Sequence, residues 1–341
     1  MSEPVLSVRD LRVWYGTARG SVRAVDEVSF DLSAGETLGL VGESGCGKST
    51  LGRGIVGLLP EGAAADGTVS FDGRNLVGLP TAELRDLRGP ELGMIFQEPM
   101  TRLDPLMRIE DHFLEMLETH EPGLSRDEMK RRSMETLGGM GIPPTRFRHY
   151  PHEFSGGMRQ RIMIALALVL RPKVVVCDEP TTALDVIVEA QILGILQDLK
   201  RNFDTALLLI THNLGIVAEA CDRVAVMYAG QIVEEGPARR VFDTPAHPYT
   251  RELLRSIISL GTEGLQYIPG APPDLIDPPA GCHFHPRCPD AMRVCASNDP
   301  VAVTKAIDHR VRCWLSGPHN LVPAGEDEPL ATREFAKADE A

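Results

Sequence analysis

A glycine-rich stretch, GESGCGKST at residues 42–50, places the strongest limit on the fold of this chain. It follows the apolar segment ETLGLV and precedes STLGRGIVGLL, whose apolar spacing is typical of a helix. The stretch fits the pattern G-x-x-x-x-G-K-[ST], in which backbone N–H groups surround phosphate oxygens at a helix N-terminus. Strand, glycine-rich turn and helix together form half of a βαβ unit, which predicts an α/β protein.

The side chains of this loop indicate what it binds. Lys48 would reach the β- and γ-phosphates, and Ser49 would place its hydroxyl on Mg²⁺. A glycine-rich turn that binds nothing is the alternative, and the strand before it and helix after it argue against that alternative. The residues expected to contact ATP here are Gly42, Ser44, Gly45, Gly47, Lys48, Ser49 and Thr50.

Apolar runs elsewhere predict the rest of an α/β core. KVVVCD (173–178), TALLLI (205–210) and RVAVMY (223–228) are apolar nearly throughout, as strands covered on both faces tend to be. Residues 5–41 alternate in the manner of strands, and we expect the fold to include an N-terminal antiparallel β subdomain. Residues from about 98 to 170 have helix-like spacing, which predicts a helical insertion.

The run VVVCDEP ends a predicted buried strand in two carboxylates, Asp178 and Glu179. Strands that end in this way place acidic groups at the carboxyl edge of the sheet, where α/β proteins bind ligands. Asp178 would hold the magnesium ion, and Glu179 would polarise the attacking water as general base. An Asp-Glu pair alone is more often a solvated turn, but a phosphate loop upstream favours the catalytic role.

FSGGMRQR, at residues 154–161, resembles the signature motif of ABC-transporter ATPases, which share the P-loop NTPase fold. Other landmarks of that family lie on both sides of it, in the family's order. Gln97 in MIFQEPM resembles the glutamine that links the nucleotide site to the membrane subunits. His212 in LLLITHNL resembles the switch histidine that contacts the γ-phosphate. The resemblance implies that the catalytic residues are Lys48, Gln97, Glu179 and His212.

The resemblance also implies how nucleotide is shared between subunits. Tyr15 in VWYG fits the aromatic residue that stacks on adenine, with Trp14 as a rival. Two such domains sandwich two ATP molecules, so this chain, with one copy of each motif, would work as a dimer or heterodimer. The residues implied to contact the ATP of the partner subunit are Ser155, Gly156, Gly157 and Asp185.

Two positions in the signature separate subgroups of the family. Met158 stands where most members have Gln, and Phe154 stands where they usually have Leu. FSGGM is similar to the oligopeptide/dipeptide (peptide/nickel) importers, and so are MIFQEPMTRLDPLMRI, HPYTRELLRSI, IPGAPPDL and GCHFHPRCP. Because Ser155 and both glycines remain, we do not expect Met158 to inactivate the motif.

The subgroup resemblance implies an ATP-hydrolysing subunit that energises peptide import. Its implied partners are a second ATPase subunit (usually a paralogue), two transmembrane permease subunits and an extracytoplasmic substrate-binding protein. The chain itself would be peripheral, on the cytoplasmic face of the membrane, because its longest apolar run, residues 162–170, is too short to span a bilayer. Import of nickel or another small solute remains an alternative.

Other classes of function fit the composition less well. A net charge of −13 argues against a nucleic-acid partner, and thus against a soluble ABC ATPase of DNA repair or translation. Long coiled-coil insertions or a second nucleotide domain, expected in those proteins, are not recognisable in the sequence. A non-hydrolysing binding subunit is disfavoured because the catalytic motifs are intact.

Four of the seven cysteines lie near the C-terminus, with the spacing C-x5-C-x6-C-x17-C. The polar, charged N-terminus shows no export signal, so we expect a reducing compartment, in which such clusters suggest metal more than disulfides. Zinc sites usually contain C-x2-C pairs, and four spread thiolates instead favour a 4Fe–4S cluster, as the subgroup resemblance also implies. Zinc, with His283 or His285 as substitute ligands, and unliganded cysteines remain open. The expected ligands are Cys282, Cys288, Cys295 and Cys313.

These patterns divide the chain into three parts. We expect a nucleotide-binding domain over residues 1–260 and a Cys- and Pro-rich module over residues 261–317, stabilised by a cross-link. The acidic stretch at residues 318–341 is expected to be disordered.

Overall fold

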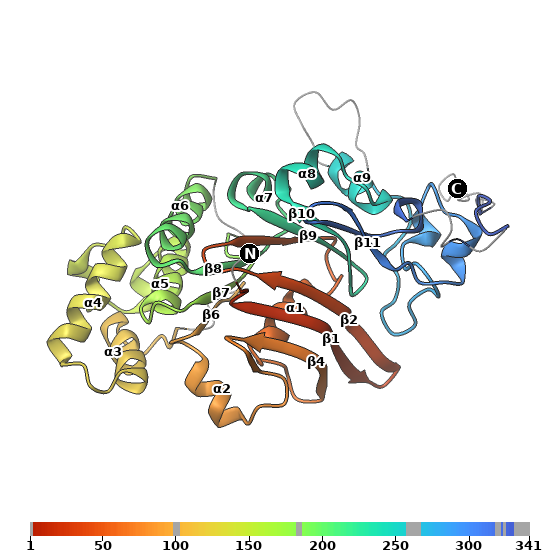
Figure 1. Ribbon diagram of the computed structural model, residues 1–341. Helices are drawn as coiled ribbons and strands as arrows, with labels where there is room; N and C mark the ends of the chain where they lie inside the picture. The colour runs from red at the N-terminus through yellow and green to blue at the C-terminus, as the bar shows by residue number, and fades with distance from the viewer. Residues whose placement is uncertain are drawn as a thin grey trace, which may run out of the picture.

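The computed structural model describes residues 3–97, 103–181, 186–256, 267–317, 322 and 325–330. Two β-sheets form its centre, with a helical region at one end and the C-terminal extension at the other (Figure 1). This arrangement is an α/β fold with an N-terminal antiparallel sheet, as the sequence predicts.

The smaller sheet is antiparallel, with the order β2-β1-β4-β5. Side chains of β1 alternate in burial over its first three residues, where Leu6 and Val8 are fully buried and Ser7 is partly exposed. One face of this sheet therefore packs against the rest of the protein. The strands are β1 (Leu6–Thr17), β2 (Gly20–Leu32), β4 (Ala63–Phe71) and β5 (Arg74–Asn75).

The larger sheet has the order β11-β12-β10-β9-β3-β8-β7-β6. The five strands from β9 to β6 run parallel, and the others extend the sheet in antiparallel fashion. Since β8 lies between β3 and β7, the loops that follow these three strands meet at one edge. The bounds are β3 (Thr37–Val41), β6 (Leu92–Ile95), β7 (Val174–Asp178), β8 (Ala206–Ile210), β9 (Arg223–Tyr228), β10 (Gln231–Pro237), β11 (Ala302–Ala306) and β12 (His309–Arg312).

The strand β7 shows why the sequence is apolar without alternation. Val174 and Val176 face the core between the two sheets, which helix α1 (Lys48–Ile55) fills. Val175 and Cys177 face the opposite core, beneath the helices of the helical region. Both faces of the strand are thus covered, as expected for parallel strands.

The helical region packs α3, α4 and α5 against one another and against the end of the sheet (Figure 1). In the described part of the predicted insertion, residues 103–170, three main helices and two 3₁₀ turns form. The bounds here are α3 (Ile109–His120), α4 (Arg126–Gly139), α5 (Gly156–Leu168) and α6 (Val186–Phe203), with 3₁₀ turns at Pro144–Arg146 and Pro151–Glu153. The remaining helices are α2 (Thr81–Leu87), α7 (Leu214–Ala220), α8 (Ala238–Asp243) and α9 (Pro248–Arg255). Among the described residues, no helix has the length and apolarity needed to cross a bilayer.

The C-terminal extension joins the rest of the protein through the large sheet. Val311 of β12 pairs with Glu234 of β10, so strands from both sides of residues 260–261 belong to one sheet. Three short 3₁₀ turns, His285–Arg287, Arg293–Ala296 and Trp314–Ser316, make up much of the rest. Within the tail expected to be disordered, residues 325–330 have a defined path, because Glu326, Glu328 and Leu330 share backbone hydrogen bonds with residues 291–294.

An aromatic cluster holds the extension against the core. The rings of Tyr228 in β9, Tyr249 in α9 and Phe284 in the extension lie with centroids 4.6 to 5.3 Å apart. All three side chains are almost fully buried. Aromatic packing of this kind adds to the hydrophobic stabilisation of the contact.

Candidate nucleotide site

The phosphate loop joins β3 to α1 and depends on its glycines for its path. Gly42 and Gly47 have φ angles of 155° and 109°, and Gly45 has 80°. A Cβ atom on Gly42 would lie 2.1 Å from the Met227 carbonyl oxygen, and one on Gly47 would lie 1.9 Å from the Ala24 carbonyl oxygen. Only glycine fits these two positions, because the backbone of neighbouring strands occupies the space.

Lys48 begins α1 and is 6% exposed. Its Nζ donates hydrogen bonds to the carbonyl oxygens of Gly42, at 2.8 Å, and Glu43, at 2.9 Å. The ammonium is therefore held inside the loop that the sequence predicts to surround phosphates. A phosphate group is a stronger acceptor for it than these two carbonyls.

Ser49 and Asp178 meet across the carboxyl edge of the sheet. Ser49 Oγ donates to Asp178 Oδ1 at 2.7 Å, and Asp178 is fully buried at the end of β7. Its other oxygen, Oδ2, is buried without a hydrogen-bond partner among the described residues. Burial raises the pKa of the Asp178 carboxyl. A buried carboxylate oxygen without a donor, next to a hydroxyl, fits Mg²⁺, which takes oxygen ligands from one or two side chains and from phosphates.

Glu179 lies between Gln97 and His212, so the structure brings together three residues from three segments of the chain. Gln97 Nε2 donates to Glu179 Oε2 at 3.0 Å, and His212 Nδ1 lies 3.3 Å from Glu179 Oε1. The backbone of Glu179 has a φ of 47°, an uncommon conformation for a residue with a side chain. Strain of this kind is often found at functional sites. The contacts with Gln97 and His212 hold both oxygens of the carboxylate.

Tyr15 contacts the helix that follows the loop. Its hydroxyl and the Thr50 Oγ1 are 3.0 Å apart and share a hydrogen bond. Trp14, the rival for adenine stacking, has the Arg23 guanidinium 5.4 Å from its ring centroid. Both aromatic side chains are half-buried. The structure therefore places Tyr15 in direct contact with a residue of the loop motif.

The signature motif caps α5. Ser155 Oγ accepts a hydrogen bond from the Met158 backbone N–H at 3.4 Å, which is an N-cap. Ser155 and Gly156 are exposed. Gln160, one turn into α5, is buried and donates from Nε2 to the Pro180 carbonyl oxygen at 2.7 Å. The signature helix is therefore bonded to the segment that directly follows Glu179.

The unusual signature residues are part of the packing around this helix. Phe154 is buried, with the Arg146 guanidinium 4.4 Å from its ring centroid, and Met158 Sδ lies 3.5 Å from the same guanidinium. Met158 thus retains a contact with a polar group. Asp185, also predicted to contact the partner's nucleotide, lies outside the described residues.

Comparison with known proteins decides the family. Residues 25–182 match the ABC transporter family model, and residues 233–295 match the model of the oligopeptide/dipeptide transporter C-terminal region. The oligopeptide transport ATP-binding protein OppD of Salmonella typhimurium is 50% identical over 301 residues, which cover 87% of this chain and 90% of that protein. The chain belongs to the ATP-binding subunits of oligopeptide/dipeptide ABC transporters.

Further similarities agree with this family. The dipeptide transport ATP-binding protein DppD of Bacillus subtilis is 46% identical over 319 residues, covering 92% of this chain and 95% of that protein. Among solved structures, the dimeric ATP-binding cassette MJ0796 bound to ADP and Pi matches with a TM-score of 0.63 and 26% identity, over 69% of this chain and 99% of that one. This protein is an ABC transporter ATPase.

The four C-terminal cysteines of this ABC ATPase are free thiols in the structure. No group of three or more His, Cys, Asp or Glu side chains in the described part of the chain could hold a metal ion, so the predicted cluster gains no support there. Burial is the main cause that raises the pKa of each thiol, to about 12 for Cys288 and about 11 for Cys313. Repulsion from the other three thiolates contributes at Cys282.

The two histidines kept as substitute zinc ligands make other contacts. His283 Nδ1 lies 2.9 Å from the Ala229 carbonyl oxygen, and His285 Nδ1 lies 2.9 Å from the Cys282 carbonyl oxygen. Each Nδ1 must carry its proton to donate to a carbonyl. Both imidazoles therefore stabilise the path of the chain around Cys282.

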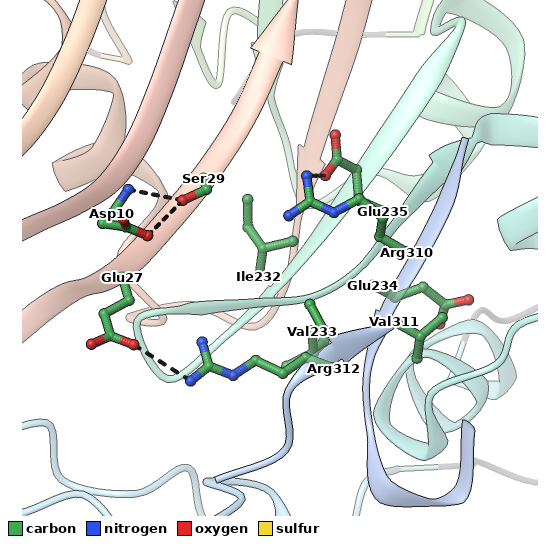
Figure 2. Close-up of a pocket in the computed structure, with 11 residues that line it drawn as sticks. Asp10, Glu27, Ser29, Ile232, Val233, Glu234, Glu235, Arg310, Val311 and Arg312 are labelled. Atoms are coloured by element: carbon green, nitrogen blue, oxygen red, sulfur yellow. Dashed lines mark hydrogen bonds and ion pairs between the residues drawn. The ribbon is translucent and has the colours of Figure 1, made fainter. Parts of the chain in front are cut away.

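A cavity of about 160 Å³ lies between the smaller sheet and the strands β10 and β12 of the ABC ATPase (Figure 2). Asp10 is bonded to Ser29, and the guanidinium of Arg312 lies 3.7 Å from the Glu27 carboxylate. The pairs drawn in Figure 2 satisfy much of its polar lining. None of its lining residues belongs to the predicted nucleotide site.

Sequence reasoning missed two residues that contact the phosphate loop. The Arg287 guanidinium of the extension bonds both oxygens of the Glu43 carboxylate, at 2.7 and 3.0 Å. Tyr249 lies 2.9 Å from the Glu43 backbone nitrogen, which donates to its hydroxyl. A separation of 244 residues left no local pattern that would relate Arg287 to Glu43.

Proposed function

We propose that this ATPase binds ATP with Mg²⁺ at the phosphate loop, hydrolyses it with Glu179 as general base, and thereby energises peptide import. The observation that carries the proposal is Glu179 held by Gln97 and His212, next to Asp178, whose buried carboxylate accepts a hydrogen bond from Ser49. A carboxylate fixed through both oxygens is well placed to orient a water molecule.

The loop residues supply the binding interactions. When ATP binds, Lys48 would donate to oxygens of the β- and γ-phosphates in place of its two carbonyl acceptors. Its positive charge would be attracted more strongly by the anionic phosphate oxygens. Ser49 and Asp178 would hold Mg²⁺, and the bound ion would supply neutralisation of the developing phosphate charge. His212 would sense the γ-phosphate from its position beside Glu179, and Tyr15 would stack on the adenine.

A second subunit would complete each site. The amide groups at the start of α5 form a helix N-terminus, which favours an anion. Exposure of Ser155 and Gly156, and the dimeric state of the similar cassette MJ0796, support contact with the partner's nucleotide. Gly157 and Asp185 would take part in the same contact. We expect the partner to be a paralogous ATPase subunit.

The transport role rests on the relatives. Their names specify oligopeptide and dipeptide transport, so we favour peptides over nickel or another small solute. The chain would act at the cytoplasmic face of the membrane with two permease subunits and an extracytoplasmic binding protein. A groove of about 310 Å³ in the helical region, lined in part by Met94, Phe96 and Met116, is a candidate docking site for a permease helix. The position of the groove supports this proposal: its lining residue Phe96 directly precedes Gln97, which resembles the glutamine that links the nucleotide site to the membrane subunits.

The test compares Glu179→Gln with Glu61→Gln, an exposed carboxylate in a surface loop. Assembled with its partners, the Glu179 variant should bind ATP, lose ATPase turnover at least about 100-fold, and abolish peptide uptake. The Glu61 variant should match the unaltered protein in all three measurements. Turnover preserved in the Glu179 variant would refute the assignment of the base. If the complex takes up another solute in an ATP-dependent manner but takes up no peptide, the peptide substrate assignment is wrong.

We also propose that Cys282, Cys288, Cys295 and Cys313 hold a metal centre, with 4Fe–4S preferred to zinc. The support is that all four cysteines lie in the C-terminal extension, where the Cys295 and Cys313 side chains are buried and those of Cys282 and Cys288 are partly buried. The four thiolates would supply all the protein ligands that a 4Fe–4S cluster takes, whereas zinc sites usually contain C-x2-C pairs, which this extension lacks. Iron and sulfide analysis of protein purified without oxygen tests the proposal. Four iron and four sulfide per chain would support the 4Fe–4S cluster. One zinc per chain would support a zinc site instead, and a protein without metal would refute both.

A further inference from the structure

The phosphate loop carries a negative charge of its own, at Glu43. This residue directly follows Gly42, and its carbonyl oxygen accepts a hydrogen bond from Lys48 Nζ at 2.9 Å. Its carboxylate is about three-quarters buried. A carboxylate left unpaired in such a position would repel the triphosphate that the loop binds and would lose its own hydration.

Arg287 neutralises this carboxylate from the C-terminal extension. Its Nη1 and Nη2 bond the two Glu43 oxygens at 2.7 and 3.0 Å in a bidentate pair. The Arg287 side chain is 5% exposed, which places the pair away from competing water. Bidentate pairs add orientation to charge, so they fix the carboxylate as well as neutralise it.

The guanidinium is itself held by the protein, so it acts as a fixed support. Its Nε donates to the Pro269 carbonyl oxygen at 2.9 Å, and its Nη2 donates to that of Ile268 at 3.2 Å. Nη1 also lies 3.3 Å from the Tyr228 hydroxyl. These acceptors, together with Glu43, satisfy the planar donor fork on several sides.

The backbone of Glu43 receives a second support from the same direction. Its N–H donates to the Tyr249 hydroxyl at 2.9 Å, and Tyr249 is fully buried against Tyr228 and Phe284. Both the backbone and the side chain of Glu43 are therefore anchored by residues outside the loop. The loop's shape at this residue depends on the C-terminal part of the chain.

We infer that Arg287 is a positioning residue for ATP binding, acting through Glu43 to hold the phosphate loop and to cancel the carboxylate charge beside the phosphates. It does not touch the nucleotide. This inference rests on the nucleotide site proposed above. It gives the C-terminal extension a role in the ATPase.

The experiment measures the Kd for Mg²⁺ATP and the KM and kcat of the full chain in its assembled complex. Arg287→Gln should raise Kd and KM about tenfold, the effect of losing a hydrogen bond to a charged group, and leave kcat within about twofold. Arg293→Gln, which removes an exposed arginine paired with Glu328, is the matched control and should change neither constant.

The double variant Glu43→Gln/Arg287→Gln separates positioning from a general structural role. With the carboxylate removed, no unpaired charge remains, so the Kd should return to within about threefold of the unaltered protein. An equally weak double variant would overturn the inference, as would unaltered binding by Arg287→Gln. If Arg287→Gln fails to fold, Arg287→Lys replaces it, since lysine retains the charge without the bidentate fork. A folded Lys variant should bind at least about threefold more weakly, and unaltered binding would again overturn the inference.

Two further binding measurements separate a failure of the proposed nucleotide site from a failure of the role of Arg287. They are made on the unaltered protein and on Lys48→Ala. If the unaltered protein does not bind Mg²⁺ATP, or Lys48→Ala binds it equally well, the proposed site is wrong. If the proposed site passes these tests and the Arg287 variants bind normally, only the role of Arg287 is wrong.

Discussion

The hydroxyl of Ser49 donates a 2.7 Å hydrogen bond to the Asp178 carboxylate, although 129 residues separate them. Ser49 lies in the first turn of α1, after β3, and Asp178 ends β7. The strand β8 pairs with both β3 and β7, so the two loops open at the same edge of the sheet. This edge is where open α/β sheets bind ligands.

The buried Asp178 carboxylate should lower the stability of the nucleotide-free protein. Its Oδ2 lacks a partner among the described residues, and burial raises its pKa, so its charged form is disfavoured. We expect Asp178→Asn to increase the free energy of unfolding by about 1 kcal/mol at pH 7 without nucleotide. The same change should abolish the stabilisation that Mg²⁺ATP confers on the unaltered protein. Thermal unfolding with and without Mg²⁺ATP measures both effects, and a destabilised Asn variant would contradict the first.

Two glycines of the phosphate loop should respond differently to alanine. A Cβ on Gly47 would lie 1.9 Å from the Ala24 carbonyl oxygen, whereas a Cβ on Gly45 would have no atom within 4 Å. Gly47→Ala should therefore displace the loop and eliminate ATP binding. Gly45→Ala, with a φ of 80°, should cost about 1 kcal/mol of stability from the backbone conformation alone. Denaturant unfolding measures the stability of the two variants, and nucleotide titration measures their ATP binding. Equal effects of the two substitutions would argue against a close approach of the Ala24 carbonyl oxygen to Gly47.

His247 should make stability depend on pH. It is buried with a pKa lowered to about 3, mainly by burial and also by the charge of Arg251. A lowered folded-state pKa means that the unfolded chain takes up the proton first, so stability falls as pH drops below about 6.5 toward 3. Compared with His247→Asn, the free energy of unfolding of the unaltered protein should fall by up to about 1.4 kcal/mol more per pH unit. The Asn variant is a suitable control because its side chain can still accept a hydrogen bond from the Tyr249 N–H. Urea unfolding at pH 7, 6 and 5 tests this, and parallel curves for both proteins would refute it.

Glu234 should be essential for docking the C-terminal extension. It is fully buried and accepts hydrogen bonds from the Ala246 and His247 backbone N–H groups, and its Oε1 lies 2.8 Å from His309 Nε2 in β12. Glu234→Ala leaves these three groups, two of them buried, without their acceptor and should cost about 3 kcal/mol. Hydrogen exchange should increase first in β11 and β12. Protection of those strands equal to that of the unaltered protein would show that the sheet pairing alone holds them.

The local motifs were readable from the sequence because their chemistry is local. The glycines, Lys48 and Ser49 lie within one loop, and Asp178 and Glu179 end one apolar strand, so order and spacing predict their roles. The α/β class follows from the apolar runs in the same way. The continuous apolar pattern of β7 predicts coverage on both faces, and helices on one side and α1 on the other supply it.

The contacts between distant segments were not readable. That β12 would extend the large sheet through β10, and that Arg287 would bond Glu43, depend on how strands and loops meet after folding. The spacing of the cysteines likewise carries no information on how far apart their sulfurs lie. The sequence by itself determined the α/β class and the family to which the chain belongs, and it predicts the nucleotide chemistry, because these depend on short motifs that are each local in the chain. The tertiary structure alone decided how the C-terminal extension supports the phosphate loop, because long-range side-chain pairing is set by strand order and packing.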